Sequence, residues 1–466
     1  MILALQASPL VVLVGLLLSG RAGPVPAVLA ALALSIPAAL ASLPAGAGAL
    51  DFIGTETLRG LWLALQPIGV MTGGLLFHAA TAAPATATTT TPEPRRIFAA
   101  CLLMGTFMES VTGFAVGAVF ALAALRSMGL NGPIAGAMAL LSLCLVPWGG
   151  LGPGTLLGAT LVGVPVQAMA HVISYPNAAW LLMLGPVLWH LCAKAGIAVP
   201  AREKLAQTGI LAASATILIG GHWILPFEIL GILATGIPLL AVLYQLDPPR
   251  SPAARSAALR TLTPYLILTT ALLAARLIPS PPALRPYETL PAFPITHVAI
   301  VLWTVSLTLL ALRPNTLRRL RDTARRAQKP AAALLLYVLL ARILAGSGAT
   351  TALAEAAAAT LGPLAPYAMT PLGLAAGLVT GSNVGANAAL VTVQAALGAA
   401  ANLPPLLAPA LHNFAGGAGA GMSFAVCALI CGLLNDGTKP GQLWRLLLPS
   451  FVAILAAGTG AMLVMR

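Results

Sequence analysis

An all-α polytopic membrane protein is the fold class that three features of this sequence predict. The chain of 466 residues is 59% hydrophobic and only 8% charged, whereas an ordinary soluble domain carries about 25% charged residues. Apolar segments rich in Leu and Ala recur at about the 20-residue length that a membrane-spanning helix requires. These segments do not alternate between polar and apolar residues, so helices are favoured over a membrane β-barrel.

The apolar segments leave room for roughly 10–14 membrane elements, given the length that each one needs. Two of them, residues 97–125 and 374–397, are expected to be interrupted helices or re-entrant hairpins because glycine and polar residues break the apolar run. The other expected spans are residues 2–19, 26–44, 58–80, 133–146, 150–170, 175–193, 207–221, 224–245, 261–278, 295–312, 331–346, 403–420, 421–434 and 443–464.

Basic residues gather in the short stretches between the apolar segments. The formal net charge is +13, and the run from Arg313 to Lys329 holds a series of arginines against the single acidic residue Asp322. This excess of positive charge is typical of cytoplasmic loops. No aromatic residues interleave with the basic run, so the lipid bilayer, and not nucleic acid, is the expected partner.

Five cysteines lie in apolar segments and form no Cys-x-x-Cys pair. Such cysteines usually behave as small buried apolar residues. Neither a disulfide framework nor a metal site is therefore expected. The five are Cys101, Cys144, Cys192, Cys427 and Cys431.

The first interruption, Gly105–Ala118, places a carboxylate and two hydroxyls among glycines in an apolar region. A charge at membrane depth costs about 3 kcal/mol or more, so such a residue marks a functional site. Glu109 is expected to take up and release a proton, and Ser110, Thr112 and Gly113 to bind substrate. The alternative is a protonated Glu109 that only hydrogen-bonds across a helix pair.

The second interruption, Thr380–Asn387, supplies neutral donors and acceptors at Ser382, Asn383, Gly385 and Asn387. The N-terminus of a broken helix presents free N–H groups and a positive dipole end, which suits a carboxylate. We expect these four residues to bind substrate. Close packing of helices through small residues is the alternative.

A third polar segment, Leu411–Gly417, adds Asn413 as an expected substrate-binding residue. His412 is a candidate charge partner because histidine titrates near neutral pH, although a lone histidine often serves only as a structural hydrogen-bonding group. Arg342 lies well inside an apolar span and is the other candidate. It could neutralise an anion, pair with a glutamate, or extend its charged end to the membrane surface.

The two halves of the chain, residues 1–246 and 261–466, repeat the same order of features on either side of an expected cytoplasmic linker, residues 247–260. Each half begins with three spans and then reaches a glycine-rich polar interruption. The first three spans of each half are expected to run in opposite directions. This is the pattern of two inverted repeats, in which paired broken helices build a substrate site near the membrane midplane.

Several motifs resemble those of a known family. Glu109-Ser-Val-Thr-Gly-Phe-Ala is similar to the Glu-Gly-Ala-Ala-Gly-Phe-Gly signature of the bacterial L-lactate permease family. Gly381-Ser-Asn-Val-Gly-Ala-Asn387 is similar to its Gly-Ser-Asp-Thr-Ser-Ser-Asn motif. Asn413 with Gly416-Gly417 lies where the family has Asn-Thr-x-Gly-Gly, and Gly346-Ser-Gly348 resembles its Ser-Gly segment. The similarity covers roughly residues 100–170 and 340–435.

The resemblance implies a secondary transporter that moves L-lactate or a related 2-hydroxymonocarboxylate, such as glycolate, with protons across a bacterial inner membrane. It implies no cofactor other than the coupling proton, and a homodimer is left open. Asn383 stands where the family has an aspartate, so proton coupling would depend on Glu109.

Three other readings stay open at this point: transport or export of a different organic anion, a passive channel, and a membrane-embedded enzyme. The six histidines are scattered, and the sequence contains no His-Glu-x-x-His motif. An enzyme is therefore the least favoured of the three.

Overall fold

The structure, a computed structural model, confirms the predicted all-α polytopic membrane fold. Among the described residues, eight helical segments are long and apolar enough to cross a membrane. Within the described part of the chain, the one sheet is a hairpin of two short strands, β1 (Ala283–Leu284) and β2 (Phe293–Pro294). The described residues are 2–19, 21–43, 48–81 and 91–466.

The first predicted interruption is the tip of a helical hairpin, hairpin 1 (residues 94–127). Its first arm consists of α4 (Pro94–Phe98), a π-helical turn (Ala99–Met104) and α5 (Gly105–Thr112). The second arm is α6 (Val116–Ser127), which packs against α5. The chain reverses at Gly113, whose φ of 71° is readily adopted by glycine.

The second predicted interruption is the tip of hairpin 2 (residues 369–400). Its arms are α16 (Met369–Thr380) and α17 (Asn383–Ala400). Gly381, with φ 68°, ends the first arm, and Ser382 caps the second. Both predicted interruptions therefore break a helix, as expected.

Each hairpin is followed by a helix that stops and restarts. Broken helix 1 (residues 132–161) consists of α7 (Gly132–Leu140), two 3₁₀ turns and α8 (Pro153–Leu161). Broken helix 2 (residues 407–434) consists of α18 (Leu407–Gly421) and α19 (Phe424–Leu434). The prediction of two separate spans at each place was wrong, because each segment is shorter than the about 20 residues that a crossing needs.

The remaining helices include several that differ from the prediction. Helix α12 starts at Pro252, so most of the expected linker 247–260 is helical, and α14 starts at Thr316, so most of the basic run is helical too. Helix α15 was not predicted. These helices are α1 (Ile2–Leu18), α2 (Pro24–Leu40), α3 (Ala49–Thr81), α9 (Val166–Lys194), α10 (Ala201–Gly220), α11 (Phe227–Leu246), α12 (Pro252–Arg276), α13 (Val298–Ala311), α14 (Thr316–Gly346), α15 (Ala349–Leu361) and α20 (Pro440–Met465).

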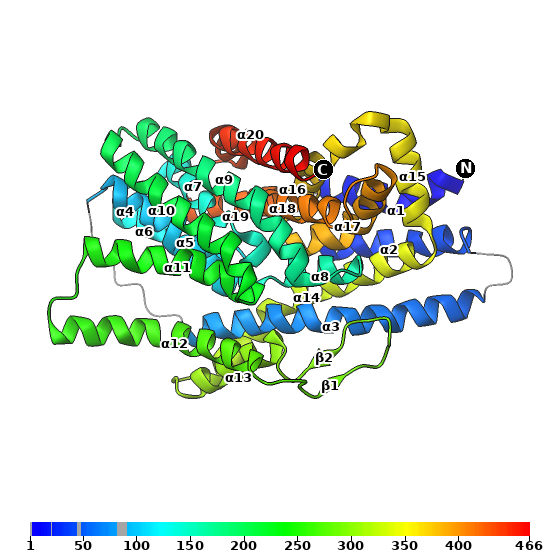
Figure 1. The fold of residues 1–466 in the computed structure, drawn as a ribbon, viewed down its shortest axis with the longest axis horizontal. Helices are drawn as coiled ribbons and strands as arrows, with labels where there is room; N and C mark the ends of the chain where they lie inside the picture. The colour runs from blue at the N-terminus through cyan, green and yellow to red at the C-terminus, as the bar shows by residue number, and fades with distance from the viewer. Residues whose placement is uncertain (1, 20, 44–47, 82–90) are drawn as a thin grey trace.

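The long helices enclose the two hairpins and the broken helices (Figure 1). Helices α3 and α14 pack antiparallel, because Arg342 near the end of α14 pairs with Glu56 near the start of α3, while Arg319 near the start of α14 bonds the carbonyl of Ala79. Helix α16 packs closely on α18, where a side chain at Gly377 would strike the Gly416 carbonyl. Small residues allow this close approach of two membrane helices.

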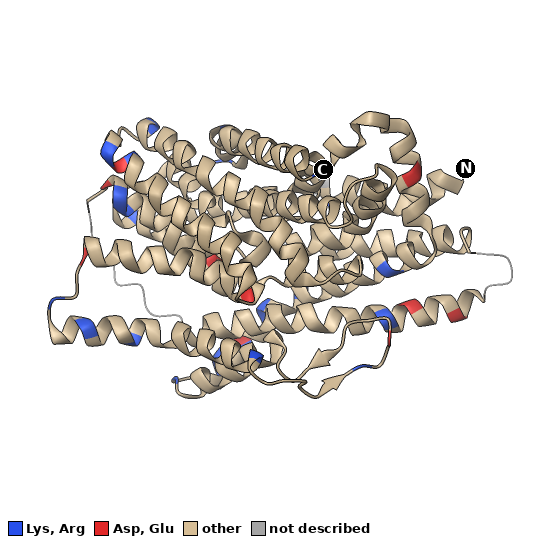
Figure 2. Cartoon of the chain, viewed as in Figure 1, with Lys and Arg blue, Asp and Glu red and all other residues tan. Residues whose placement is uncertain are grey.

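Basic residues gather at one end of the bundle, the left end in Figure 2, where α4, α10 and the start of α12 lie. There Arg95 binds Glu203 and Arg96 binds Asp247, each with a shortest distance of 2.7 Å. The Arg96 guanidinium lowers the pKa of the Asp247 carboxyl. These pairs connect the base of hairpin 1 to α10 and α11.

Candidate functional site

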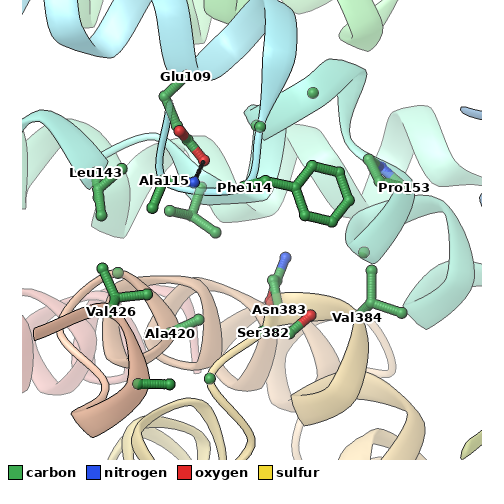
Figure 3. A pocket seen from close by; sticks show the side chains of 18 of the residues that line it. Glu109, Phe114, Ala115, Leu143, Pro153, Ser382, Asn383, Val384, Ala420 and Val426 are labelled. Carbon is green, nitrogen blue, oxygen red and sulfur yellow. Dashed lines mark hydrogen bonds between the residues drawn. The ribbon is translucent and has the colours of Figure 1, made fainter. Parts of the chain in front are cut away.

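A cavity of about 310 Å³ lies where the two hairpin tips meet the two broken helices (Figure 3). Hairpin 1 contributes Glu109, Gly113, Phe114 and Ala115 to its wall, and hairpin 2 contributes Gly381, Ser382, Asn383 and Val384. The broken helices contribute Leu143, Val146, Gly149, Gly150, Pro153, Gly154, Ala420, Gly421, Ala425, Val426 and Leu429. Segments up to about 300 positions apart in sequence therefore build one site.

Glu109 lies in the last turn of α5 and is only 4% exposed. Its carboxylate accepts hydrogen bonds from the backbone N–H groups of Ala115 (3.3 Å) and Gly117 (3.1 Å). These amides belong to the first turn of α6, which has no intrahelical partners for them. The side chain thus caps the positive end of a helix inside the protein.

The tip of hairpin 1 has an unusual backbone. Gly113, Phe114 and Ala115 have φ values of 71°, 59° and 60°, so three consecutive residues occupy the left-handed region. The tip rests on Gly150 of broken helix 1, where a Cβ on Gly113 would lie 3.2 Å from the Gly150 Cα. Only glycines permit this contact between the two interruptions.

Broken helix 1 supplies a part of the site that was not predicted from the sequence. Gly150, Leu151 and Gly152 also have positive φ, which ends the first segment before α8 begins at Pro153. The cluster of four glycines and two prolines from Pro147 to Gly154 was the signal, but it was divided between the gap after one predicted span and the start of the next, 150–170. In the structure it is an interruption like the other two.

Asn383 at the start of α17 directs its amide toward the cavity (Figure 3). Its Nδ2 donates to Asn413 Oδ1 at 3.0 Å, and the same oxygen accepts from the Thr155 hydroxyl at 3.2 Å. Behind it, Asn387 Nδ2 donates to the Asn383 carbonyl at 2.8 Å and to its side-chain oxygen at 3.1 Å. These four residues form a buried amide cluster that fixes the orientation of Asn383.

The N-termini of four helices meet at this cavity: α6 at Ala115, α8 at Pro153, α17 at Ser382 and α19 at Ala425. Helix N-termini carry partial positive charge and unpaired N–H groups, and so they attract anions. Among the described residues that line the cavity, Glu109 is the one ionisable group. Positive helix ends and one carboxyl group thus set the electrostatics of the cavity.

Several residues predicted to bind substrate lie close to the cavity without lining it. The hydroxyls of Ser110 and Thr112 donate back to the carbonyls of Thr106 and Met108 within α5. Gly385 donates its N–H to the Ser382 hydroxyl at 3.3 Å. Asn387 and Asn413 contribute through the amide cluster described above.

The two predicted charge partners lie elsewhere. Arg342 pairs with Glu56 of α3. Pairing with a glutamate was one of the three roles that the sequence left open for it. His412 is fully buried, and its Nε2 lies 3.0 Å from the carbonyl oxygen of Ala386. Neither residue lines the cavity.

Comparison with known proteins adds two findings. No curated protein matches the chain. The solved structure of MtrF from Neisseria gonorrhoeae, one of a class of antimetabolite efflux pumps, is similar over 95% of both chains, with a TM-score of 0.50 and 13% sequence identity. At this identity the likeness shows a shared fold.

A family model gives the second finding. It matches residues 287–466, which include hairpin 2 and broken helix 2 but not the Glu109 motif. The model describes the L-lactate permease family, so over these residues the match agrees with the family that the motifs predicted, and the chain is a multi-pass membrane transporter.

Proposed function

We propose that this protein is a secondary active transporter that carries L-lactate, or a related small 2-hydroxymonocarboxylate, together with a proton across the bacterial inner membrane. One observation carries the proposal: four helix N-termini surround a cavity in which, among the described lining residues, the one ionisable group is a carboxyl. The family match over residues 287–466 supports the substrate class.

The cavity suits a small anion. Because no described Lys, Arg or His lines it, the anion would be held by helix dipoles and backbone N–H groups. Such a site binds less tightly than an arginine clamp, and a transporter must also release its substrate. A volume of about 310 Å³ is at the lower end for small-molecule pockets, which fits a ligand of a few heavy atoms.

Glu109 provides a physical route to proton coupling. Its carboxylate occupies the N–H groups of Ala115 and Gly117, which are the best anion donors at the hairpin 1 tip. When Glu109 takes up a proton, its hold on these amides weakens because a neutral acid is a poorer acceptor than a carboxylate. The substrate carboxylate then replaces it, so that proton and anion enter the site together.

Alternating access is proposed to rest on two inverted repeats. The chain twice forms a long helix, a hairpin, a broken helix and another long helix in that order. The first series runs from α3 to α9 and the second from α14 to α20, where α15 is an additional helix before the hairpin. The antiparallel packing of α3 on α14 agrees with opposite directions for the two repeats. In such transporters one bundle moves against the other around a central site.

The test is uptake of labelled L-lactate into proteoliposomes with an imposed pH gradient. We expect saturable uptake that follows the gradient in the wild type and loses this dependence in E109Q. The matched control is E228Q, because Glu228 is also a buried glutamate but pairs with Arg276 at 2.5 Å outside the cavity. Unchanged proton-driven uptake by E109Q would refute the coupling role, and the absence of wild-type uptake of any 2-hydroxy acid would refute the substrate.

A further inference from the structure

Phe114 is the one aromatic residue among the described residues that line the cavity. Its side chain projects from the hairpin 1 tip into the space that separates this tip from Val384 and Pro153 (Figure 3). Phe114 is 44% exposed, although its neighbours Gly113 and Ala115 are packed against broken helix 1 or buried. One part of the ring is therefore not packed against protein and faces the open space of the cavity.

The backbone at Phe114 is unfavourable for this residue type. A non-glycine residue in the left-handed region costs about 1–2 kcal/mol, and Phe114 has a φ of 59°. Glycine would adopt the same conformation without this strain. A bulky residue in such a conformation indicates a function that local stability does not explain.

The local contacts show why the strain persists. The Gly113 N–H donates to the Glu109 carbonyl at 2.8 Å, and the Ala115 N–H donates to the Glu109 side chain at 3.3 Å. The residues on both sides of Phe114 are thus tied to Glu109. This arrangement holds the backbone of Phe114 in place relative to Glu109.

The lining of the cavity carries both polar and apolar side chains. Glu109, Ser382 and Asn383 carry its polar side chains, and Phe114, Val384, Val426 and Leu429 are among its apolar ones. A 2-hydroxy acid has the same division, with a carboxylate and a hydroxyl on one side and an alkyl substituent on the other. The substituent of a bound acid would face the ring.

We infer that Phe114 sets substrate size: its ring narrows the cavity beside Val384 and Pro153 and admits only 2-hydroxy acids with a short substituent on C2. This inference rests on the proposed function, because it assumes that a 2-hydroxy acid occupies the cavity. It names a residue that selects among such acids.

The experiment measures thermal stabilisation of the purified full-length protein by glycolate, L-lactate, 2-hydroxybutyrate, 2-hydroxyisocaproate and mandelate. The wild type should prefer the smallest acids. In F114A the concentration that gives half-maximal stabilisation should fall about tenfold or more for the two largest acids and rise several-fold for lactate. F114L should lie between the two.

Two further variants control for effects on folding. F114G should show the same change of preference together with a higher melting temperature without ligand, because glycine removes the backbone strain. F120A truncates a phenylalanine that lies on the same hairpin, in α6, and does not line the cavity, and it should leave the preference unchanged.

The outcomes separate the two proposals. If the wild type binds lactate and F114A keeps the wild-type order of preference, the inference about Phe114 is overturned and the proposed function stands. The same conclusion follows if F120A changes the preference as much as F114A does. If no 2-hydroxy acid stabilises the wild type, the proposed function is overturned, and the inference with it.

Discussion

The tips of hairpin 1 and hairpin 2 face the same cavity but are built in different ways. Hairpin 1 brings a carboxyl group, an aromatic ring and three consecutive residues with positive φ. Hairpin 2 brings a hydroxyl and an amide, and Gly381 is its one residue with positive φ. The first tip can change its charge, whereas the second is a neutral surface fixed by its own hydrogen bonds.

This difference indicates a division of labour. A group that exchanges a proton must reorganise its hydrogen bonds, and the Glu109 carboxylate has two that it can release. Asn383 is tied to Asn413 and through it to Thr155, so its amide keeps one orientation. We expect hairpin 1 to govern coupling and hairpin 2 to govern the geometry of binding.

The largest effect is expected from the packing of the hairpin arms. A Cβ on Gly117 would lie 2.2 Å from the Gly105 carbonyl oxygen, whereas one on Gly385 would lie 3.0 Å from the Thr380 Cβ. G117A should therefore lower the free energy of unfolding by about 3 kcal/mol or prevent folding, and G385A by about 1 kcal/mol. Thermal unfolding of the purified variants measures both, and equal losses would show that the two hairpins are packed alike.

A second large effect is expected when hairpin 2 receives a charge. In N383D a carboxylate would face the cavity opposite Glu109 and repel the anionic substrate. At neutral pH the apparent affinity for lactate should fall about 100-fold, which corresponds to roughly 3 kcal/mol. As the pH falls the new carboxyl is protonated, so binding should recover.

Isothermal titration with lactate across a pH series measures this change. The control is N435D, which adds a carboxylate at the exposed end of α19, away from the cavity. If the lactate affinity of N383D stays low at low pH, the cause is a structural defect and not charge repulsion.

The same comparison shows how far the sequence could lead. Glycines among polar residues in an apolar run predicted both hairpin tips, and four of the predicted site residues, Glu109, Gly113, Ser382 and Asn383, line the cavity. The two tips could be located because charged or amide side chains at membrane depth are costly and therefore informative. Apolar segments predicted most of the other helices for the same reason.

Other features left no such signal. Broken helix 1 has no charged or amide residue at its break, so the break was predicted only as the short gap between the spans 133–146 and 150–170. The pairing of Arg342 with Glu56 joins residues 286 positions apart, which one sequence without its fold cannot show. Phe114 has a positive φ, which phenylalanine seldom adopts. Its residue type therefore gave no reason to expect a left-handed backbone at this position.

A moderate effect is expected from the amide cluster. N413A removes the oxygen that accepts from Asn383, which leaves one buried donor without that partner at about 1–3 kcal/mol. The Thr155 hydroxyl keeps its shorter bond of 2.6 Å to the Pro147 carbonyl. Freed from this contact, Asn383 should adopt other orientations, and lactate affinity should fall about tenfold. Titration calorimetry of N413A against the wild type provides the measurement.

The control for the amide cluster is N177A. Asn177 is also fully buried and bonds the Cys144 carbonyl at 2.7 Å, but it does not contact Asn383. N177A should lower stability and leave lactate affinity within about twofold. A tenfold loss of affinity in both variants would assign the effect to general destabilisation.

The smallest effect separates two roles of Ser382. Its hydroxyl accepts from the Gly385 N–H at 3.3 Å and so caps α17, and the residue also lines the cavity. S382A should lower the free energy of unfolding by about 1 kcal/mol because the cap is lost. S382G should lower it by only a few tenths of a kcal/mol because glycine is itself a good N-cap.

If the Ser382 hydroxyl also contacts the substrate, both variants should lose the same two- to fivefold in lactate affinity despite their different stabilities. If affinity instead follows stability, Ser382 only shapes the helix end, and hairpin 2 recognises the substrate through Asn383 and the backbone N–H groups of α17.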